Sequence, residues 1–195
     1  MRYLTNLGDA AVVLPVAALI LLWLLDLAGQ RIAVLWCCAL LVAGGGTALL
    51  KIYVDACSAP VPGLDSPSGH TGMSTLVYGG LALMIGTETA SWRRLAVGAA
   101  GVAIVATIAL SRVLLGAHDL IEVVVGLLIG SAALALFARS YVGVPAAGQR
   151  RIWPLAFATS ILAAALALSN HPVQLEPLWH MIADNLRSAT GFCRT

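Results

Sequence analysis

The sequence predicts an all-α fold, a polytopic membrane bundle of about six transmembrane helices. Its 195 residues are 60% hydrophobic and only 10% charged, whereas a soluble domain carries roughly 25% charged residues. The apolar residues are grouped into long runs, and a helix that crosses a bilayer needs about 20 of them. These observations exclude a water-soluble domain, and the net charge of +2 argues against a nucleic-acid partner.

Hydropathy divides the apolar residues into windows, each of which we expect to form one helix. The windows are 10–27, 32–50, 71–85, 95–115, 120–137 and 154–168. The third is the shortest, and Ser68 with Gly69 after Pro67 predicts that its helix begins slightly earlier. Only a tight turn around Gly116 separates the fourth window from the fifth.

The windows fit a single membrane domain over residues 1–168, followed by a less apolar tail over residues 169–195. Large apolar residues recur in the tail at helical spacing, which predicts a polar or interfacial segment on the membrane surface. Two cysteines inside the second window are expected to pack as small hydrophobic residues. Cys57 and Cys193 fall on the same predicted side, so a disulfide between them stays open.

Basic residues predict the orientation, because Lys and Arg collect in cytoplasmic loops. With the N-terminus outside, the inner loops hold six arginines, namely Arg31, Arg93, Arg94, Arg139, Arg150 and Arg151. The outer segments then hold three, Arg2, Arg187 and Arg194, once Lys51 and Arg112 are set aside as functional. We therefore expect a multi-pass protein of the inner (plasma) membrane whose polar connections face the periplasm or the exterior.

Two connections on that predicted face concentrate the polar residues. The first holds Lys51 and the run 65–71, and the second extends from Ser111 to Glu122. Polar residues at the ends of membrane helices are costly unless they are paired or functional. The set matches the needs of phosphate-ester chemistry, which requires cations or amides around the phosphate, an in-line nucleophile and an acid for the leaving alcohol.

The histidines are candidates for the reacting groups. His118 and Glu122 are four positions apart, so they share a helix face, and the carboxylate can hold one ring nitrogen while the other attacks. His118 is therefore the predicted nucleophile. His70, from the other connection, is the predicted proton donor to the leaving oxygen.

The phosphate itself would be held by cations and by a helix start. Arg112 can grip two phosphate oxygens and Lys51 adds a point charge. Ser68 and Gly69 open a helix whose amides and dipole favour an anion. This scheme requires no metal and no cofactor.

These motifs resemble the type 2 phosphatidic acid phosphatase family, in its membrane lipid phosphatase branch. The matching residues are Pro67-Ser68-Gly69-His70, then Ser111-Arg112 and, after five residues, His118. The resemblance covers about residues 51–130. It implies His118 as nucleophile, His70 as general acid, and phosphate binding by Lys51, Ser68, Gly69 and Arg112. It also implies hydrolysis of a lipid phosphate such as undecaprenyl diphosphate, phosphatidic acid, phosphatidylglycerol phosphate or the phosphates of lipid A.

Two positions depart from the family pattern. After Lys51 and six further residues the family has Arg-Pro, whereas this chain has Ser58-Ala59, which removes a phosphate contact worth about 1.5 to 3 kcal/mol. Glu122 stands where the family has Asp, which keeps the charge and lengthens the side chain by one methylene.

Other functions stay open at this point. One is a lipid-phosphate binder or transporter with little or no turnover, and another is a lipid phosphotransferase that uses the same site. A third is a membrane hydrolase in which a divalent metal is held by His70, His118, Asp119 and Glu122. Asp119 is otherwise expected to cap the fifth helix. The partners expected are the lipid substrate and membrane lipids, and the sequence leaves the oligomeric state open.

Overall fold

The computed structural model describes residues 2–57, 62–87, 89–142, 152–169, 173 and 176–190, and these residues form helices and turns without a strand. The helices are α1 (Arg2–Asn6), α2 (Ala10–Leu27), α3 (Gln30–Leu40), the π-helix η1 (Leu41–Gly45), α4 (Gly46–Cys57), α5 (Gly69–Thr87), α6 (Ser91–Leu114), α7 (Leu120–Tyr141), α8 (Ile152–Ser169) and α9 (Glu176–Thr190). The predicted all-α fold is confirmed, and each apolar window lies within or nearly within a helix.

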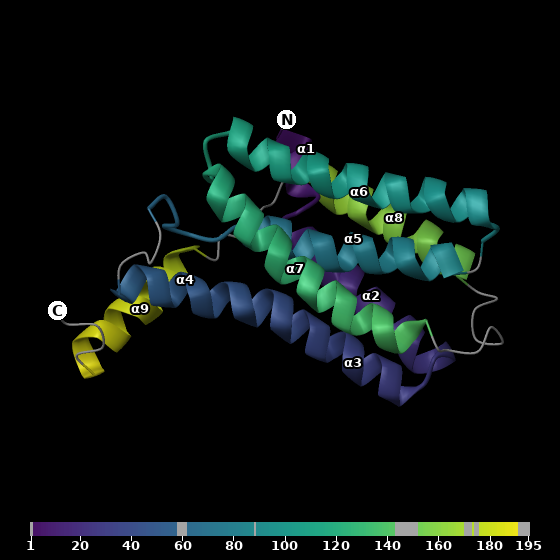
Figure 1. Cartoon of the computed structure of the whole chain (residues 1–195), viewed down its shortest axis with the longest axis horizontal. Coiled ribbons are helices and arrows are strands. Elements are labelled where there is room, and N and C mark those ends of the chain that lie inside the picture. Colours follow the sequence, from purple (N-terminus) through teal and green to yellow (C-terminus); the bar gives the residue numbers. More distant parts are fainter. Residues whose placement is uncertain are drawn as a thin grey trace.

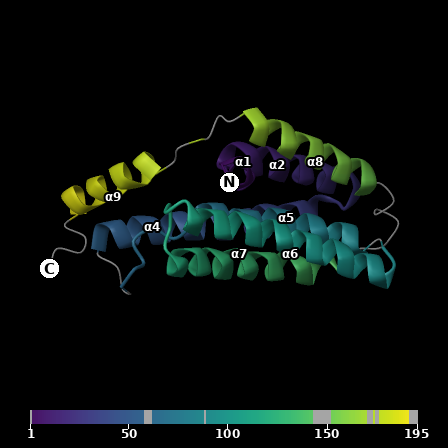
Figure 2. The ribbon, with the colours of Figure 1, turned by 90° about the horizontal axis from the view of Figure 1, so that it is seen from above.

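Four stretches in the described part of the chain are long and apolar enough to cross a membrane. They are Gln30–Cys57, Ser91–Leu114, Leu120–Tyr141 and Ile152–Ser169. Helices α2 and α5 lie lengthwise among them (Figures 1 and 2). Large apolar side chains cover the outer faces, with Leu95 and Phe157 more than 70% exposed, at 76% and 71%. Such a surface suits lipid rather than water, so this is a membrane protein.

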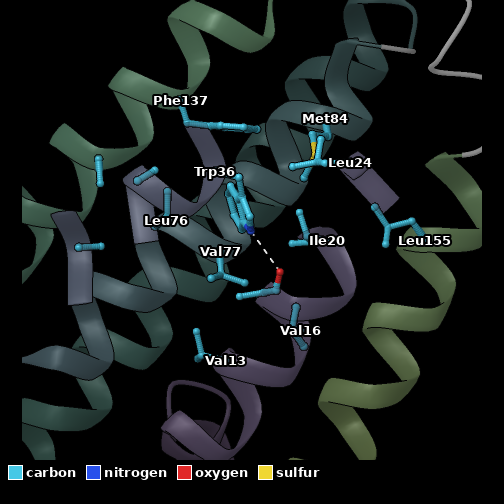
Figure 3. Close-up of a cluster of buried hydrophobic side chains, with 14 of the residues drawn as sticks. Val13, Val16, Ile20, Leu24, Trp36, Leu76, Val77, Met84, Phe137 and Leu155 are labelled. Atoms are coloured by element: carbon cyan, nitrogen blue, oxygen red, sulfur yellow. Dashed lines mark hydrogen bonds between the residues drawn. The ribbon is translucent and has the colours of Figure 1, made fainter. Parts of the chain in front are cut away.

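Helix α5 is the centre of the bundle. It packs most extensively against α6 and α7, and it also contacts α2 and α8. Figure 3 shows Trp36 of α3 directed between α2 and α5, where its indole Nε1 donates to the Ala17 carbonyl at 3.1 Å. The Trp36 ring meets Phe137 of α7 edge to face at 4.9 Å between centroids. This apolar cluster fixes the middle of the bundle and leaves the polar residues to one end.

The second predicted helix is longer than its apolar window and contains an irregularity. It runs from Gln30 to Cys57 and is interrupted by η1, which is followed by the glycine at position 46. As a result Lys51 lies inside α4 rather than in a loop, and its side chain is buried. π-Helical turns of this kind occur frequently at functional sites.

The tail contains a helix, α9, that packs against α4 at one end of the bundle (Figure 1). Arg187 donates to the Ala56 carbonyl at 3.2 Å and also to the carbonyl of Asp55. His180 Nδ1 lies 2.9 Å from the Asp55 carboxylate. Asp55 is therefore a helical residue with a partner in the tail. The placement of the tail on a membrane surface stays a prediction.

Candidate active site

The two predicted connections meet at the N-terminal ends of α5 and α7. The Ser68 amide donates to the Glu122 carbonyl at 3.1 Å, and the Ser66 amide donates to the Glu122 carboxylate. A single residue of α7 thus holds the chain that leads into α5. The loop that carries Ser68 and the turn that carries His118 are on the same end of the bundle.

Glycines let α5 and α7 approach at backbone distance behind this meeting point. A Cβ atom at Gly126 would collide with the Ser68 carbonyl oxygen, and one at Gly130 would collide with the Gly72 carbonyl oxygen. At Gly72, a Cβ would lie 3.2 Å from the Gly126 carbonyl oxygen. The relative position of the two histidine-bearing segments is therefore set by backbone contact.

His118 is buried and held by Glu122. Its Nδ1 lies 2.8 Å from Glu122 Oε2, and its side chain is 5% exposed. The same Oε2 accepts the Asp119 amide at 3.1 Å, and Asp119 is the N-cap of α7 as predicted. With Nδ1 engaged, Nε2 is the nitrogen left for chemistry.

Burial lowers the pKa of His118 below its usual value of 6.5. The hydrogen bond with Glu122 acts in the opposite direction, and the positive charges of Arg112 and Lys51 lower the pKa further. A lowered pKa keeps the imidazole neutral at neutral pH. A neutral imidazole with one nitrogen held by a carboxylate is the form that can act as a nucleophile.

Ser68 and Gly69 start α5 as expected. Ser68 is fully buried, its carbonyl accepts the Gly72 amide at 3.1 Å, and its hydroxyl lies 3.0 Å from the Thr71 hydroxyl. Helix α5 begins at Gly69. The first amides of a helix lack partners within that helix and favour an anion.

Arg112 lies near the end of α6, beside the turn that carries His118. Its carbonyl accepts the His118 amide at 3.3 Å, and its Nη1 donates to the Thr5 hydroxyl at 3.2 Å. Its Nε is buried and has no hydrogen-bond partner among the described residues. A buried N–H group without a partner is costly, and a bound anion would offset that cost.

Lys51 and His70 each face a carboxylate that the sequence did not predict for the site. Lys51 Nζ donates to the Ser66 hydroxyl at 3.0 Å and pairs with Glu176 of α9. His70 Nε2 lies 3.5 Å from Oδ2 of Asp9, the N-cap of α2. Asp9 and Glu176 are both far from the motifs along the chain. The residues around them indicate only the start of a helix, so the sequence does not connect either carboxylate with the site.

A cavity of about 720 Å³ opens onto these residues. Lys51, Gly69, His70 and Arg112 line it, together with Asp9 and Glu176. Ser68, His118 and Glu122 are buried near this wall but are not part of it. The predicted residues are thus gathered at one end of the bundle, with four of them on the surface of a shared cavity.

Some predictions concern residues outside the described part of the chain. Ser58, which replaces the family arginine, and Cys193, whose disulfide with Cys57 the sequence leaves open, are among them. The described residues contain no group of three or more His, Cys, Asp or Glu side chains arranged to hold a metal ion. The metal-ligand set considered from the sequence therefore does not form such a cluster.

A family model described as the PAP2 superfamily matches residues 51–144. This match supports an assignment to the type 2 phosphatidic acid phosphatase family. The matched segment extends from Lys51 to beyond Glu122 and so includes every site residue predicted from the sequence. The match also supports a phosphatase-type function. A search of curated proteins and a search of solved structures each gave no match.

Proposed function

We propose that this protein is a PAP2-type enzyme that hydrolyses the phosphate ester of a membrane lipid through a phosphohistidine intermediate, without a metal ion. The observation that carries the proposal is the buried Nε of Arg112, which has no partner in the described part of the chain. The Arg112 side chain lies on the wall of the cavity, which Lys51 and His70 also line. A tetrahedral dianion bound there would satisfy the guanidinium and meet His70, with His118 buried behind the cavity wall.

In the proposed first step, Nε2 of His118 attacks phosphorus while Glu122 holds Nδ1. The bond between phosphorus and the lipid oxygen breaks, and His70 gives a proton to that oxygen. In the second step, His70 takes a proton from water, which attacks phosphorus and breaks the bond to His118. The products are the lipid alcohol and inorganic phosphate, and both histidines return to their starting state.

Arg112, Lys51 and the start of α5 would stabilise the charge that develops on phosphate. Arg112 presents a planar fork that matches two oxygens, and Lys51 supplies a compact charge. The amide of Gly69, at the start of α5, would add the positive end of the α5 dipole. Such groups act most strongly where water is excluded, and Lys51 and Ser68 are both buried.

A lipid substrate suits the walls of the cavity away from these polar groups. Val13 and Leu14 of α2, Ala48 of α4 and Met73 of α5 line it. Leu14 is also 52% exposed on the outside of the bundle. An apolar chain could therefore extend from the phosphate site along α2 toward the bilayer.

The distribution of arginines supports a site on the non-cytoplasmic face. Arg31, Arg94 and Arg139 belong to the ends of helices remote from the site, whereas Arg112 belongs to the site itself. Basic residues mark the cytoplasmic end of membrane helices. We therefore assign the end that carries the cavity to the periplasm or the exterior of the inner membrane.

A phosphate-release assay tests the proposal. Purified protein in detergent is incubated with EDTA and with a panel of phosphatidic acid, phosphatidylglycerol phosphate and undecaprenyl diphosphate. We expect phosphate release by the wild type, none by His118→Ala, and an acid-labile, base-stable phosphoprotein after a rapid acid-free quench. Lipid binding without release by either protein would identify a binder, and activity only after zinc is supplied would identify a metal hydrolase. Phosphate transfer to an added alcohol in place of release would identify a phosphotransferase.

A further inference from the structure

The turn between α1 and α2 lies against the helix face that carries His70. The Gly8 amide donates to the Thr5 carbonyl at 2.9 Å, which closes the turn. The Tyr78 hydroxyl of α5 donates to the Leu7 carbonyl at 2.6 Å. Tyr78 lies two helical turns after His70 and so projects from the same face of α5. The turn is therefore anchored beside His70 although it is distant in sequence.

Gly8 makes this approach close. A Cβ at Gly8 would lie 2.7 Å from Ile108 Cγ2 and 3.3 Å from His70 Cβ. Any larger residue would push the turn away from α5 and α6. The absence of a side chain at Gly8 thus determines where the next residue, Asp9, is placed.

The two oxygens of the buried Asp9 carboxylate have different partners. Oδ1 accepts the amides of Ala11 and Val173, each at 2.9 Å. Oδ2 lies 3.5 Å from His70 Nε2. One oxygen thus fixes the local backbone, while the other is directed at the predicted proton donor.

Asp9 is ionised at neutral pH. Burial alone would raise the pKa of Asp9, but the contact with His70 and the hydrogen bonds from the Val173 and Ala11 amides lower the pKa below its usual value of 3.8. The side chain is 6% exposed. A buried carboxylate that remains charged is an effective partner for an imidazolium.

We propose that Asp9 is a positioning residue for His70, holding its Nε2–H so that Nδ1 is the nitrogen that exchanges the proton with the leaving oxygen. The inference rests on the proposed function, in which His70 is the general acid. As the lipid oxygen departs from phosphorus, the proton on Nδ1 moves to it, and His70 becomes neutral while Nε2–H stays with Asp9. In the second step Nδ1 takes a proton from the attacking water, which restores the starting state.

The variant Asp9→Asn separates this role from the structural one. Asn is a good N-cap, and its carbonyl oxygen can still accept the amides that Oδ1 accepts. It replaces Oδ2 by an NH₂ group, which cannot accept the Nε2–H of His70. Asp26→Asn, at an exposed position near the other end of α2, is the matched control.

The test compares two phosphate esters that differ in their need for an acid. A short-chain phosphatidic acid has an alkoxide leaving group that must be protonated, whereas p-nitrophenyl phosphate has a stable leaving group. We expect Asp9→Asn to lower kcat for the alkyl ester by about tenfold to a hundredfold and kcat for the aryl ester by less than about threefold. His70→Ala should show the same asymmetry, Asp9→Glu should partly recover the alkyl activity, and Asp26→Asn should match the wild type.

Equal losses on both esters would overturn the proposal, since they would mean that Asp9 is only structural. An unchanged kcat on the alkyl ester would overturn it as well. In both cases wild-type turnover that is abolished by His118→Ala would leave the proposed function intact. Absence of phosphate release from both esters by the wild type would instead overturn the proposed function on which the inference rests.

Discussion

Lys51 of α4 is paired with Glu176, the first residue of α9. The two side chains differ in environment, since Lys51 is 6% exposed and Glu176 is 52% exposed. The Lys51 ammonium is thus buried in the bundle, whereas the Glu176 carboxylate contacts it from the surface. In the proposed function, the carboxylate of Glu176 would compete with an oxygen of the substrate phosphate for Lys51.

We expect Glu176→Gln to strengthen the binding of anions, because the substrate would no longer compete with a carboxylate for Lys51. The inhibition constant for inorganic phosphate should fall by about twofold to fivefold, as expected for losing one partly exposed charge interaction. Competition assays on the purified protein measure this constant. Asp184→Asn, which removes an exposed carboxylate of the same helix, is the control and should change nothing. An unchanged constant in Glu176→Gln would contradict the prediction.

The acidic limb of the pH profile of kcat/KM should lie below pH 6.5, because His118 must be neutral to attack and its pKa is lowered from 6.5. Glu122→Gln removes the carboxylate that raises this pKa. The limb should therefore move to still lower pH, while kcat falls by about a hundredfold or more. Steady-state rates between pH 4 and 8 provide the measurement, with Asp119→Asn, which preserves the N-cap, as the control. A limb that moves upward would refute the assigned role of Glu122.

Arg112→Lys should behave as a disruptive substitution although it keeps the charge. Lysine cannot offer two parallel N–H groups to one phosphate. Its side chain is also shorter, so it would lose the hydrogen bond that Arg112 Nη1 donates to the Thr5 hydroxyl. A loss of 1.5 to 3 kcal/mol in a charge-assisted contact corresponds to about tenfold to a hundredfold in kcat/KM. Thr5→Ala, measured in parallel, separates the loss of that contact from the loss of the fork. Wild-type kcat/KM in Arg112→Lys would show that the fork is not used.

Gly126→Ala should separate α5 from α7 and reduce both stability and activity. The added methyl group would meet the Ser68 carbonyl oxygen, and overpacking of this kind costs about 1 to 3 kcal/mol. Gly98→Ala is the control, since a Cβ there would meet nothing within 4 Å. Thermal unfolding in detergent, followed by circular dichroism, reports stability. Equal melting temperatures for the two variants would contradict the close-packing argument.

The helices could be predicted from sequence because burial in lipid demands long apolar runs, and such runs are visible without any tertiary information. The predicted start of the third helix near Ser68 and the cap at Asp119 are also local features. The roles of the motif residues stay predictions, although Lys51, His70 and Arg112 do line one cavity. Local patterns were thus sufficient to identify residues that meet at one end of the bundle, and that these residues form a functional site stays a prediction.

Asp9 and Glu176 could not be assigned to the site in this way. Asp9 reaches His70 because Gly8 permits a close approach between segments about sixty residues apart. Glu176 reaches Lys51 across 125 residues of sequence. Their neighbours in sequence predict only the starts of helices. The hydrophobic periodicity does not indicate which residues of the bundle these helix starts will contact.

The π-helical turn over Leu41–Gly45 sets the direction in which the side chains of the following helix, α4, point. A π turn accommodates one more residue than an α turn, and each residue rotates a helix by about 100°. With this turn in place, Thr47 and Lys51 point inward and Leu49 points outward, 69% exposed. Deleting one residue from this stretch would restore regular winding and rotate the ammonium away from its cavity. The direction of the Lys51 side chain thus depends on the apolar residues and glycines of the π-helical turn, which lie more than one turn earlier in the helix.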